Sequence, residues 1–222
     1  MLLRAGTGAQ GGGGADAPPA PRYALRVTRP LRPTTYLDGR MRTARLELVP
    51  ATLAHLDAAL AGPAELARAL GAVVPRTWPH EFLDDAAFVY ARDRLREAPE
   101  SAAWWLHFVV LVDDREGPAL VGSAGTKGPP DATGAVEIGY GIVSDRRRRG
   151  FATEAARALV EHAFADARVR RVIAETLPEL VGSIGVLGQC GFRRVEGASE
   201  PGVLRFAITR EEWTRWWEEH AR

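Results

Sequence analysis

The stretch of sequence that most constrains the fold runs from residue 136 to residue 164 and reads VEIGYGIVSDRRRRGFATEAARALVEHAF. Its first eight residues are aliphatic, aromatic or glycine apart from Glu137, which is typical of a strand buried on both faces. After Gly150 the apolar residues recur with helical spacing. The stretch therefore predicts a buried strand, a short turn carrying four arginines, and a helix packed on the sheet.

The turn between this strand and this helix has the character of an anion site. The first N–H groups of a helix have no acceptor within the helix, and the aligned peptide dipoles leave about half a positive charge there. Gly150 removes a side chain where an anion must approach the backbone, and residues 146–149 add four guanidinium groups that suit phosphate oxygens. We therefore expect the ligand to be a phosphorylated small molecule.

Other phosphate-binding interpretations of this turn fit the sequence less well. A P-loop requires Gly-Lys-Ser/Thr at the helix start, where this chain has Gly150 followed by Phe151, and a dinucleotide fingerprint requires a glycine where this chain has Ser144. An RNA-binding patch is a further alternative, but no aromatic residues are interleaved with the arginines. Residues 1–40 carry six arginines and two aspartates, so the remaining 23 basic and 26 acidic residues leave the rest of the chain at net −3. We favour a cofactor phosphate over nucleic acid.

The turn instead matches the pattern R-x-x-G-x-A through Arg147, Gly150 and Ala152, directly after a strand of the form EIGY. This arrangement resembles the acetyl-CoA pyrophosphate loop of the GNAT superfamily of N-acetyltransferases. The EIGY and RRRGFATEA segments are similar to its ribosomal-protein (alanine) N-acetyltransferase branch, and SIGVLGQCGF at residues 183–192 is similar to the family's second block. The resemblance implies an enzyme that transfers an acetyl group directly from acetyl-CoA to a primary amine, on a protein N-terminus or a small molecule.

The resemblance also implies the fold class, an α/β (α+β) domain with a mixed, mostly antiparallel sheet that is splayed at the cofactor site and flanked by helices. A chain of 222 residues with 46% hydrophobic content supports one core. We expect the domain to occupy residues 41–222. Residues 1–40 are rich in glycine, proline and arginine without apolar periodicity, so we expect a disordered extension there. A native start at Met41 is a further hypothesis.

Alternation and periodicity predict the remaining elements. We expect strands at 44–49, 104–112, 119–125, 136–143, 169–176 and 203–208 and from Phe192, and helices at 53–60, 64–70, 84–96, 181–189, after Gly150 and after Thr209. Thr209 and Glu212 form a capping box for the last helix. Its residues Trp213, Trp216 and Trp217 fall on one stripe, which we expect to be core or the contact of a homodimer.

The resemblance assigns two groups of cofactor residues. The backbone of Ile142 and Val143 would bind the pantetheine arm and polarise the acetyl carbonyl. The turn and the first helical residues would hold the pyrophosphate, and these are Arg147, Arg148, Arg149, Gly150, Phe151, Ala152 and Thr153.

Acetyl transfer to an amine needs a group that accepts a proton from the amine and a group that assists the departing thiolate. Glu137 is the candidate base because it is the one carboxylate in an apolar strand, with a purely structural role as the alternative and Glu175 as the second candidate. Ser183 stands where the ribosomal-protein branch has a serine near the CoA sulfur, and it is the candidate donor to the thiolate. Helix capping is its alternative role, and Tyr140 is another possible donor.

Two departures from the family pattern keep a second function open. Leu187 stands where many relatives have a tyrosine, and Leu180 replaces an asparagine that contacts CoA in many relatives. A non-catalytic acyl-CoA-binding regulatory module would keep the cofactor turn and lose turnover. On the acceptor side, Trp78 and His80 are candidate contacts in a loop that the resemblance places beside the acceptor, with packing as the alternative for the tryptophan.

Composition sets the remaining expectations. The single cysteine, Cys190, excludes an internal disulfide, and no apolar run approaches the roughly 20 residues of a membrane span. We expect a cytoplasmic protein whose partners are acetyl-CoA and a small-molecule or peptide amine. We expect no metal, nucleic acid or membrane among its ligands.

Overall fold

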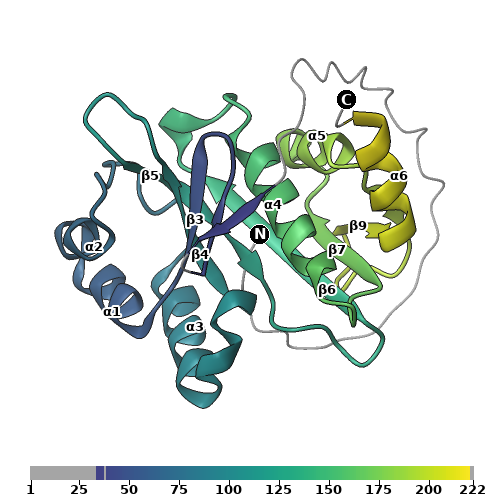
Figure 1. The fold of residues 1–222 in the computed structure, drawn as a ribbon, viewed down its shortest axis with the longest axis horizontal. Coiled ribbons are helices and arrows are strands. Elements are labelled where there is room, and N and C mark those ends of the chain that lie inside the picture. The colour runs from purple at the N-terminus through teal and green to yellow at the C-terminus, as the bar shows by residue number, and fades with distance from the viewer. Residues whose placement is uncertain (1–33, 38, 221–222) are drawn as a thin grey trace.

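The computed structural model describes residues 34–37 and 39–220, which form one nine-stranded sheet with helices on both faces (Figure 1). The strands are β1 (Thr35–Leu37), β2 (Arg40–Arg42), β3 (Leu46–Pro50), β4 (Leu106–Leu111), β5 (Ala119–Thr126), β6 (Ala135–Ile142), β7 (Arg171–Thr176), β8 (Arg193–Val195) and β9 (Leu204–Thr209). The helices are α1 (Leu53–Ala61), α2 (Pro63–Leu70), α3 (Asp85–Glu97), α4 (Phe151–Ala165), α5 (Val181–Gln189) and α6 (Arg210–His220), with short 3-10 helices η1 (Pro99–Trp104) and η2 (Ser144–Arg146).

The strand order is β1-β2-β3-β4-β5-β6-β7-β9-β8. Every neighbouring pair is antiparallel except β6 and β7, which are parallel and joined by α4. The expected mixed, mostly antiparallel fold is confirmed. The single parallel pair is formed by the sixth and seventh of the nine strands in this order, and it contains the strand that precedes the arginine turn.

Two apolar clusters hold the helices on opposite faces of the sheet. Helices α4, α5 and α6 pack on one face through residues such as Leu159, Leu187 and Trp213. Helices α1, α2 and α3 pack on the other face through residues such as Leu66 and Phe88. Figure 1 shows α4 crossing the middle of the sheet while α1 and α2 lie at one end of the molecule and α6 at the other. The arginine turn therefore joins the sheet to the helix that covers its centre.

The sheet begins earlier in the chain than the sequence suggested. Thr35–Leu37 pairs with Arg40–Arg42, and the second of these strands pairs with β3, so described residues before Met41 take part in the sheet. Strands of three residues with charged neighbours give no periodic signal, although Met41 itself is buried. The rest of the expected extension, residues 1–33 and 38, lies outside the described residues.

Most other expected elements are confirmed with shifts of a few residues at their ends. The strand expected at 104–112 is shorter, because η1 takes the chain through Trp104 and β4 starts at Leu106. The capping box of α6 is confirmed, since Thr209 Oγ1 accepts from the N–H of Glu212 at 3.2 Å while the Glu212 carboxylate accepts from the N–H of Thr209 at 2.9 Å.

Candidate functional site

The parallel strands β6 and β7 separate before β6 ends. Their pairing runs from Ala135 opposite Arg171 to Ile138 opposite Ala174 and stops there. Beyond that point β6 continues to Ile142 along β5, whereas β7 continues to Thr176 along β9. The central sheet is therefore open on one side of β6 over its last residues.

The open edge of β6 exposes backbone groups to the gap. Glu137 and Val143 bond to β5, since Lys127 N donates to the Glu137 carbonyl at 2.9 Å and Val143 N donates to the Val121 carbonyl at 3.0 Å. Because backbone groups alternate sides along an antiparallel strand, Tyr140 and Ile142 direct theirs toward β7, which is no longer paired there. The position of Ile142 is thus compatible with the expected binding of the pantetheine arm by its backbone. The N–H of Val143 is not available for that arm, because it already donates to the Val121 carbonyl within the sheet.

The N-terminus of α4 supplies further unpaired donors beside this gap. Gly150 precedes the helix in the left-handed conformation, with φ of 81°, and the first bond within the helix runs from Glu154 N to the Gly150 carbonyl. The N–H groups of Phe151, Ala152 and Thr153 therefore have no acceptor within the helix. They lie where the dipole of α4 favours an anion.

The four arginines of the turn have four different environments. Arg146 pairs with Asp114 at 2.7 Å, and the guanidinium of Arg149 lies 4.9 Å from the centre of the Phe151 ring. The Nε of Arg147 donates to the Ile142 carbonyl at 2.9 Å, and its guanidinium forms an ion pair with Glu81. Arg148 has a positive φ of 61°, and among the described residues its side chain has no hydrogen-bond or ion-pair partner. Among the described residues, the guanidinium groups of Arg148 and Arg149 both lack a hydrogen-bond or ion-pair partner, and that of Arg149 lies over the Phe151 ring.

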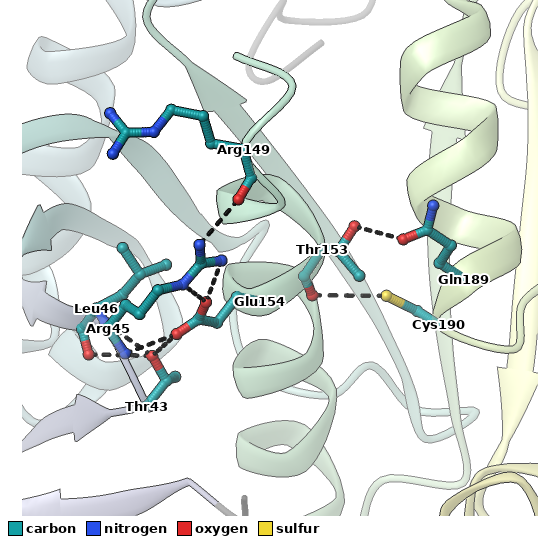
Figure 2. A network of polar contacts seen from close by, with 8 residues as sticks. All are labelled: Thr43, Arg45, Leu46, Arg149, Thr153, Glu154, Gln189 and Cys190. Carbon is teal, nitrogen blue, oxygen red and sulfur yellow. Dashed lines mark hydrogen bonds and ion pairs between the residues drawn. The ribbon is translucent and has the colours of Figure 1, made fainter. Parts of the chain in front are cut away.

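A second network fixes the first turn of α4 from its other side. Figure 2 shows Thr43 and Arg45 meeting the Glu154 carboxylate on one side of the helix, while Thr153 faces α5 on the other. Glu154 accepts from the backbone and the Nε of Arg45 at 2.8 and 2.7 Å. Arg45 in turn donates to the Arg149 carbonyl at 2.9 Å. The backbone of the arginine turn is thus held against the β2–β3 connection.

The open edge of β6, the start of α4 and the start of α5 surround one cavity of about 560 Å³. Its walls include the expected cofactor residues Ile142, Arg147, Arg148, Gly150, Phe151, Ala152 and Thr153, together with Tyr140 and Ser183. Arg149, Val143 and Glu137 are not among the lining residues. A cavity of this size, with unpaired N–H donors and one free guanidinium, fits a ligand that carries a pyrophosphate.

The sequence agrees with what this geometry indicates. Residues 45–193 match the family model described as the acetyltransferase (GNAT) domain. The chain belongs to the GNAT acetyltransferase family. It is therefore an acetyl-CoA-dependent acyltransferase, and YjdG, an uncharacterised N-acetyltransferase of Bacillus subtilis strain 168, is 30% identical to it over 153 residues, 68% of this chain and 88% of the relative.

Solved structures share the GNAT fold at low sequence identity. The structure of RimL, named as a ribosomal L7/L12 α-N-protein acetyltransferase in complex with coenzyme A, matches with a TM-score of 0.53 at 17% identity, covering 75% of this chain and 95% of that one. Mycobacterium smegmatis RimJ, solved with a CoA disulfide, matches with a TM-score of 0.51 at 21% identity, covering 84% and 90%. At these identities the likeness concerns the fold alone.

The two candidate bases of this GNAT domain are both engaged. The carboxylate of Glu137 forms an ion pair with Lys127 and retains 16% of its exposure. Glu175 accepts from the N–H of Ser199 and from Arg205, each at 2.8 Å. Burial alone would raise the pKa of Glu175, but these donors outweigh it and lower that pKa. The contacts give Glu175 a structural role and leave Glu137 as the better candidate.

Ser183 lies in the wall of the cavity on the first turn of α5. Its Oγ is 3.3 Å from the hydroxyl of Tyr140, which also donates to the Ser183 carbonyl at 3.3 Å. No side chain caps the N-terminus of α5, so the alternative capping role is not observed. Burial raises the pKa of Tyr140, which keeps its hydroxyl protonated.

The two acceptor candidates differ in position. Trp78 is buried against Phe88 and Phe108, so it has the packing role that the sequence offered as the alternative to contact with the acceptor. His80 is also buried, but its ring points at β6, where a Cβ on Gly141 would lie 2.2 Å from the His80 Cε1. Its Nε2 is 2.7 Å from Ser123 Oγ on β5. His80 therefore supports the strand from behind the cavity wall.

Several lining residues were missed from the sequence. Glu81 and Phe82 enter from the loop before α3, and Glu179 and Gln189 enter from the two ends of α5. Spacing cannot reveal the first pair, because the ion pair of Glu81 with Arg147 joins residues 66 positions apart. Glu179 precedes the second block at residues 183–192, and Gln189 lies within that block, but the resemblance assigned no role to either side chain.

Other features of the described residues complete the site. Cys190 is fully buried, and burial raises its pKa to about 12, so its thiol is a core group. Within residues 34–37 and 39–220 no three His, Cys, Asp or Glu side chains gather as a metal site. The same residues include no helix with the length and apolarity needed to cross a membrane.

Proposed function

We propose that this GNAT enzyme transfers the acetyl group of acetyl-CoA directly to a primary amine, with a protein N-terminus as the first acceptor to test and small-molecule amines as the second. The observation that carries the proposal is the cavity that joins the unpaired N–H groups of α4 to the open edge of β6. The likeness of fold to RimL, named as an α-N-protein acetyltransferase, supports the choice of the first acceptor.

We assign the pyrophosphate to the start of α4. The N–H groups of Phe151, Ala152 and Thr153 would bind its oxygens, and Gly150 leaves the approach open. Arg148 would add the charge, since its guanidinium has no other partner among the described residues. Arg147 and Arg149, which the sequence also suggested, would act through their backbones or through their neighbours.

We assign the acyl-bearing arm to the open edge of β6, where the backbone groups of Tyr140 and Ile142 face the gap. Bound acetyl-CoA supplies an acyl thioester, whose carbonyl carbon the amine attacks. A backbone N–H aimed at the carbonyl oxygen stabilises the charge that develops there. Val143 has no part in this assignment.

We assign the proton transfers to Glu137 and Ser183. Glu137 lies on the β6 face shared with Gly141 and the loop before α3, with Lys127 holding its carboxylate in place. It is four residues from Gly141, about 13 Å along the strand, so a chain of several waters would carry the proton from the amine to it. The hydroxyl of Ser183 would donate to the departing thiolate, with Tyr140 at 3.3 Å behind it.

The test is release of free CoA thiol by the purified protein from acetyl-CoA, with and without a panel of peptides, amino acids and polyamines. Amine-dependent thiol release together with an acetylated product of the expected mass is the result we expect. Tight binding of CoA without thiol release under any amine would contradict the proposal and favour the non-catalytic module.

A further inference from the structure

The loop at residues 75–84 lies between α2 and α3 and binds the end of β6 and the arginine turn through three side chains. Thr77 Oγ1 donates to Asp145 Oδ1 at 2.5 Å. His80 contacts Ser123 at 2.7 Å and rests against the backbone of Gly141. Glu81 forms an ion pair with Arg147. The two loops are thus joined side chain to side chain.

Arg147 is the centre of this connection. Its Nε donates to the Ile142 carbonyl at 2.9 Å, while its outer nitrogen reaches Glu81. A guanidinium presents its donors in a rigid plane, so fixing Nε on the end of β6 also fixes the direction of the bond to Glu81. Arg147 therefore fixes the position of loop 75–84 relative to Ile142, the last residue of β6.

The pair lies in the wall of the cavity. Glu81, Arg147 and Gly141 all line it, and Phe82 follows Glu81 on the same wall. The cavity thus runs from the start of α4, through the gap beside β6, to loop 75–84 on the face that carries Glu137. Glu81 and Phe82 therefore line the side of the cavity that an amine approaching from this face would contact.

The exposure of the Glu81–Arg147 pair indicates that it contributes little to the stability of the fold. The side chains of Arg147 and Glu81 keep 42% and 48% of their exposure, and ion pairs this exposed add little to the stability of a fold. Arg148 offers the contrast, because it lines the same cavity and has no partner among the described residues. Two adjacent arginines of one motif therefore face different tasks.

We propose that Arg147 is a positioning residue for the acceptor side, and that the Glu81–Arg147 pair holds loop 75–84 against β6 so that Glu81 and Phe82 shape the path of the incoming amine. The inference rests on the proposed function for the meaning of that path. It goes beyond that function by moving Arg147 from the cofactor to the acceptor and by adding Glu81 and Phe82 to the determinants of amine specificity.

The first test needs no turnover. Hydrogen exchange of the full chain is compared for Glu81→Gln, Arg147→Met and the double variant, and coenzyme A is titrated into each by calorimetry. We expect amides of residues 76–83 to exchange at least three-fold faster in all three variants, with no further increase in the double variant. We expect the dissociation constant of coenzyme A to change less than two-fold.

Two matched controls separate the alternatives. Arg148→Met removes the neighbouring guanidinium and should weaken coenzyme A about ten-fold without changing exchange in residues 76–83. Glu179→Gln makes the same change as Glu81→Gln at another cavity residue, and loop exchange should again stay as in the parent protein.

The second test uses acetyl transfer to a short peptide with a free amino terminus. Glu81→Gln and Arg147→Met should each raise the KM for the peptide about five-fold, with kcat and the KM for acetyl-CoA within two-fold of the parent. A ten-fold loss of coenzyme A affinity in Arg147→Met alone, or unchanged loop exchange in both variants, would overturn the inference. Absence of transfer to every amine would instead refute the proposed function and leave the exchange result standing.

Discussion

Gly141 matters through the side chain that it lacks. A Cβ at this position would lie within 2.5 Å of three atoms of the buried His80 ring. The ring is held by Ser123 and by packing against Trp78, so it has little freedom to move away. At the scale of single residues, the close packing of the His80 ring on the backbone of Gly141 fixes the position of the loop before α3 relative to β6.

Gly141→Ala is therefore expected to lower the free energy of unfolding by about 1–3 kcal/mol through overpacking. Gly188→Ala is the matched control, because nothing lies within 4 Å of its added Cβ and alanine is the better residue in a helix. That variant should be stabilised by up to about 1 kcal/mol. Chemical denaturation measures both, and equal effects in the two variants would contradict the packing account.

Acid should destabilise the protein through two buried histidines. Burial lowers the pKa of His80 to about 4 and that of His107 to about 3, both from 6.5. Between the folded pKa and 6.5 these histidines are protonated in the unfolded chain but neutral in the folded protein. The free energy of unfolding is therefore highest above pH 6.5 and declines as the pH falls toward the folded pKa. Each contributes a slope of up to about 1.4 kcal/mol per pH unit. Denaturation at pH 7, 6 and 5 should show this loss, and a constant free energy of unfolding would contradict it.

Glu137→Gln tests the proposed base. The amide keeps the size of the side chain but cannot accept the amine proton, so turnover should fall at least ten-fold. The affinity for coenzyme A, measured by calorimetry, should stay within two-fold because Glu137 does not line the cavity. Parent-like turnover in this variant would remove Glu137 from the mechanism.

At the scale of elements, the site depends on how the first turn of α4 is anchored. The sequence predicted this helix and the glycine before it, because both depend on residues that are adjacent in the chain. Its anchor could not be predicted, since Glu154 binds Arg45 across 109 positions of sequence. The sequence also could not distinguish the arginines at 146–149 from one another. They form one charge cluster in the sequence, whereas their side chains lie in four different environments in the structure. Only tertiary contacts distinguish Arg147 from Arg148.

Glu154→Ala should show what this anchor contributes. The change removes the acceptor of Thr43 and of the Arg45 backbone and guanidinium, so we expect a loss of about 2–3 kcal/mol of stability. Glu218→Ala on the exposed side of α6 is the control and should stay within about 0.5 kcal/mol of the parent. Similar thermal denaturation of the two variants would show that the anchor is dispensable.

At the scale of the whole molecule, the fold makes the site by pairing strands incompletely. The sequence predicted most strands by alternation, and these agree with the structure. The motif predicted a turn before α4, which the structure contains, whereas the binding of a cofactor by that turn stays a prediction. The resemblance implied that the sheet splays at the cofactor site, but it did not give the residue at which β6 leaves β7, because that depends on β7 pairing onward with β9 and β6 with β5. For the same reason Val143 was assigned to the cofactor, although the sheet already uses its N–H.

The central claim is that N–H groups at the start of α4 bind the pyrophosphate of coenzyme A. Calorimetric titration of coenzyme A into the parent protein and into Gly150→Glu tests it most directly, with Gly202→Glu as the control at another glycine of positive φ that does not line the cavity. We predict saturable binding to the parent and the control and at least ten-fold weaker binding to Gly150→Glu. Absence of binding to the parent protein, or equal affinity in all three, would contradict the account.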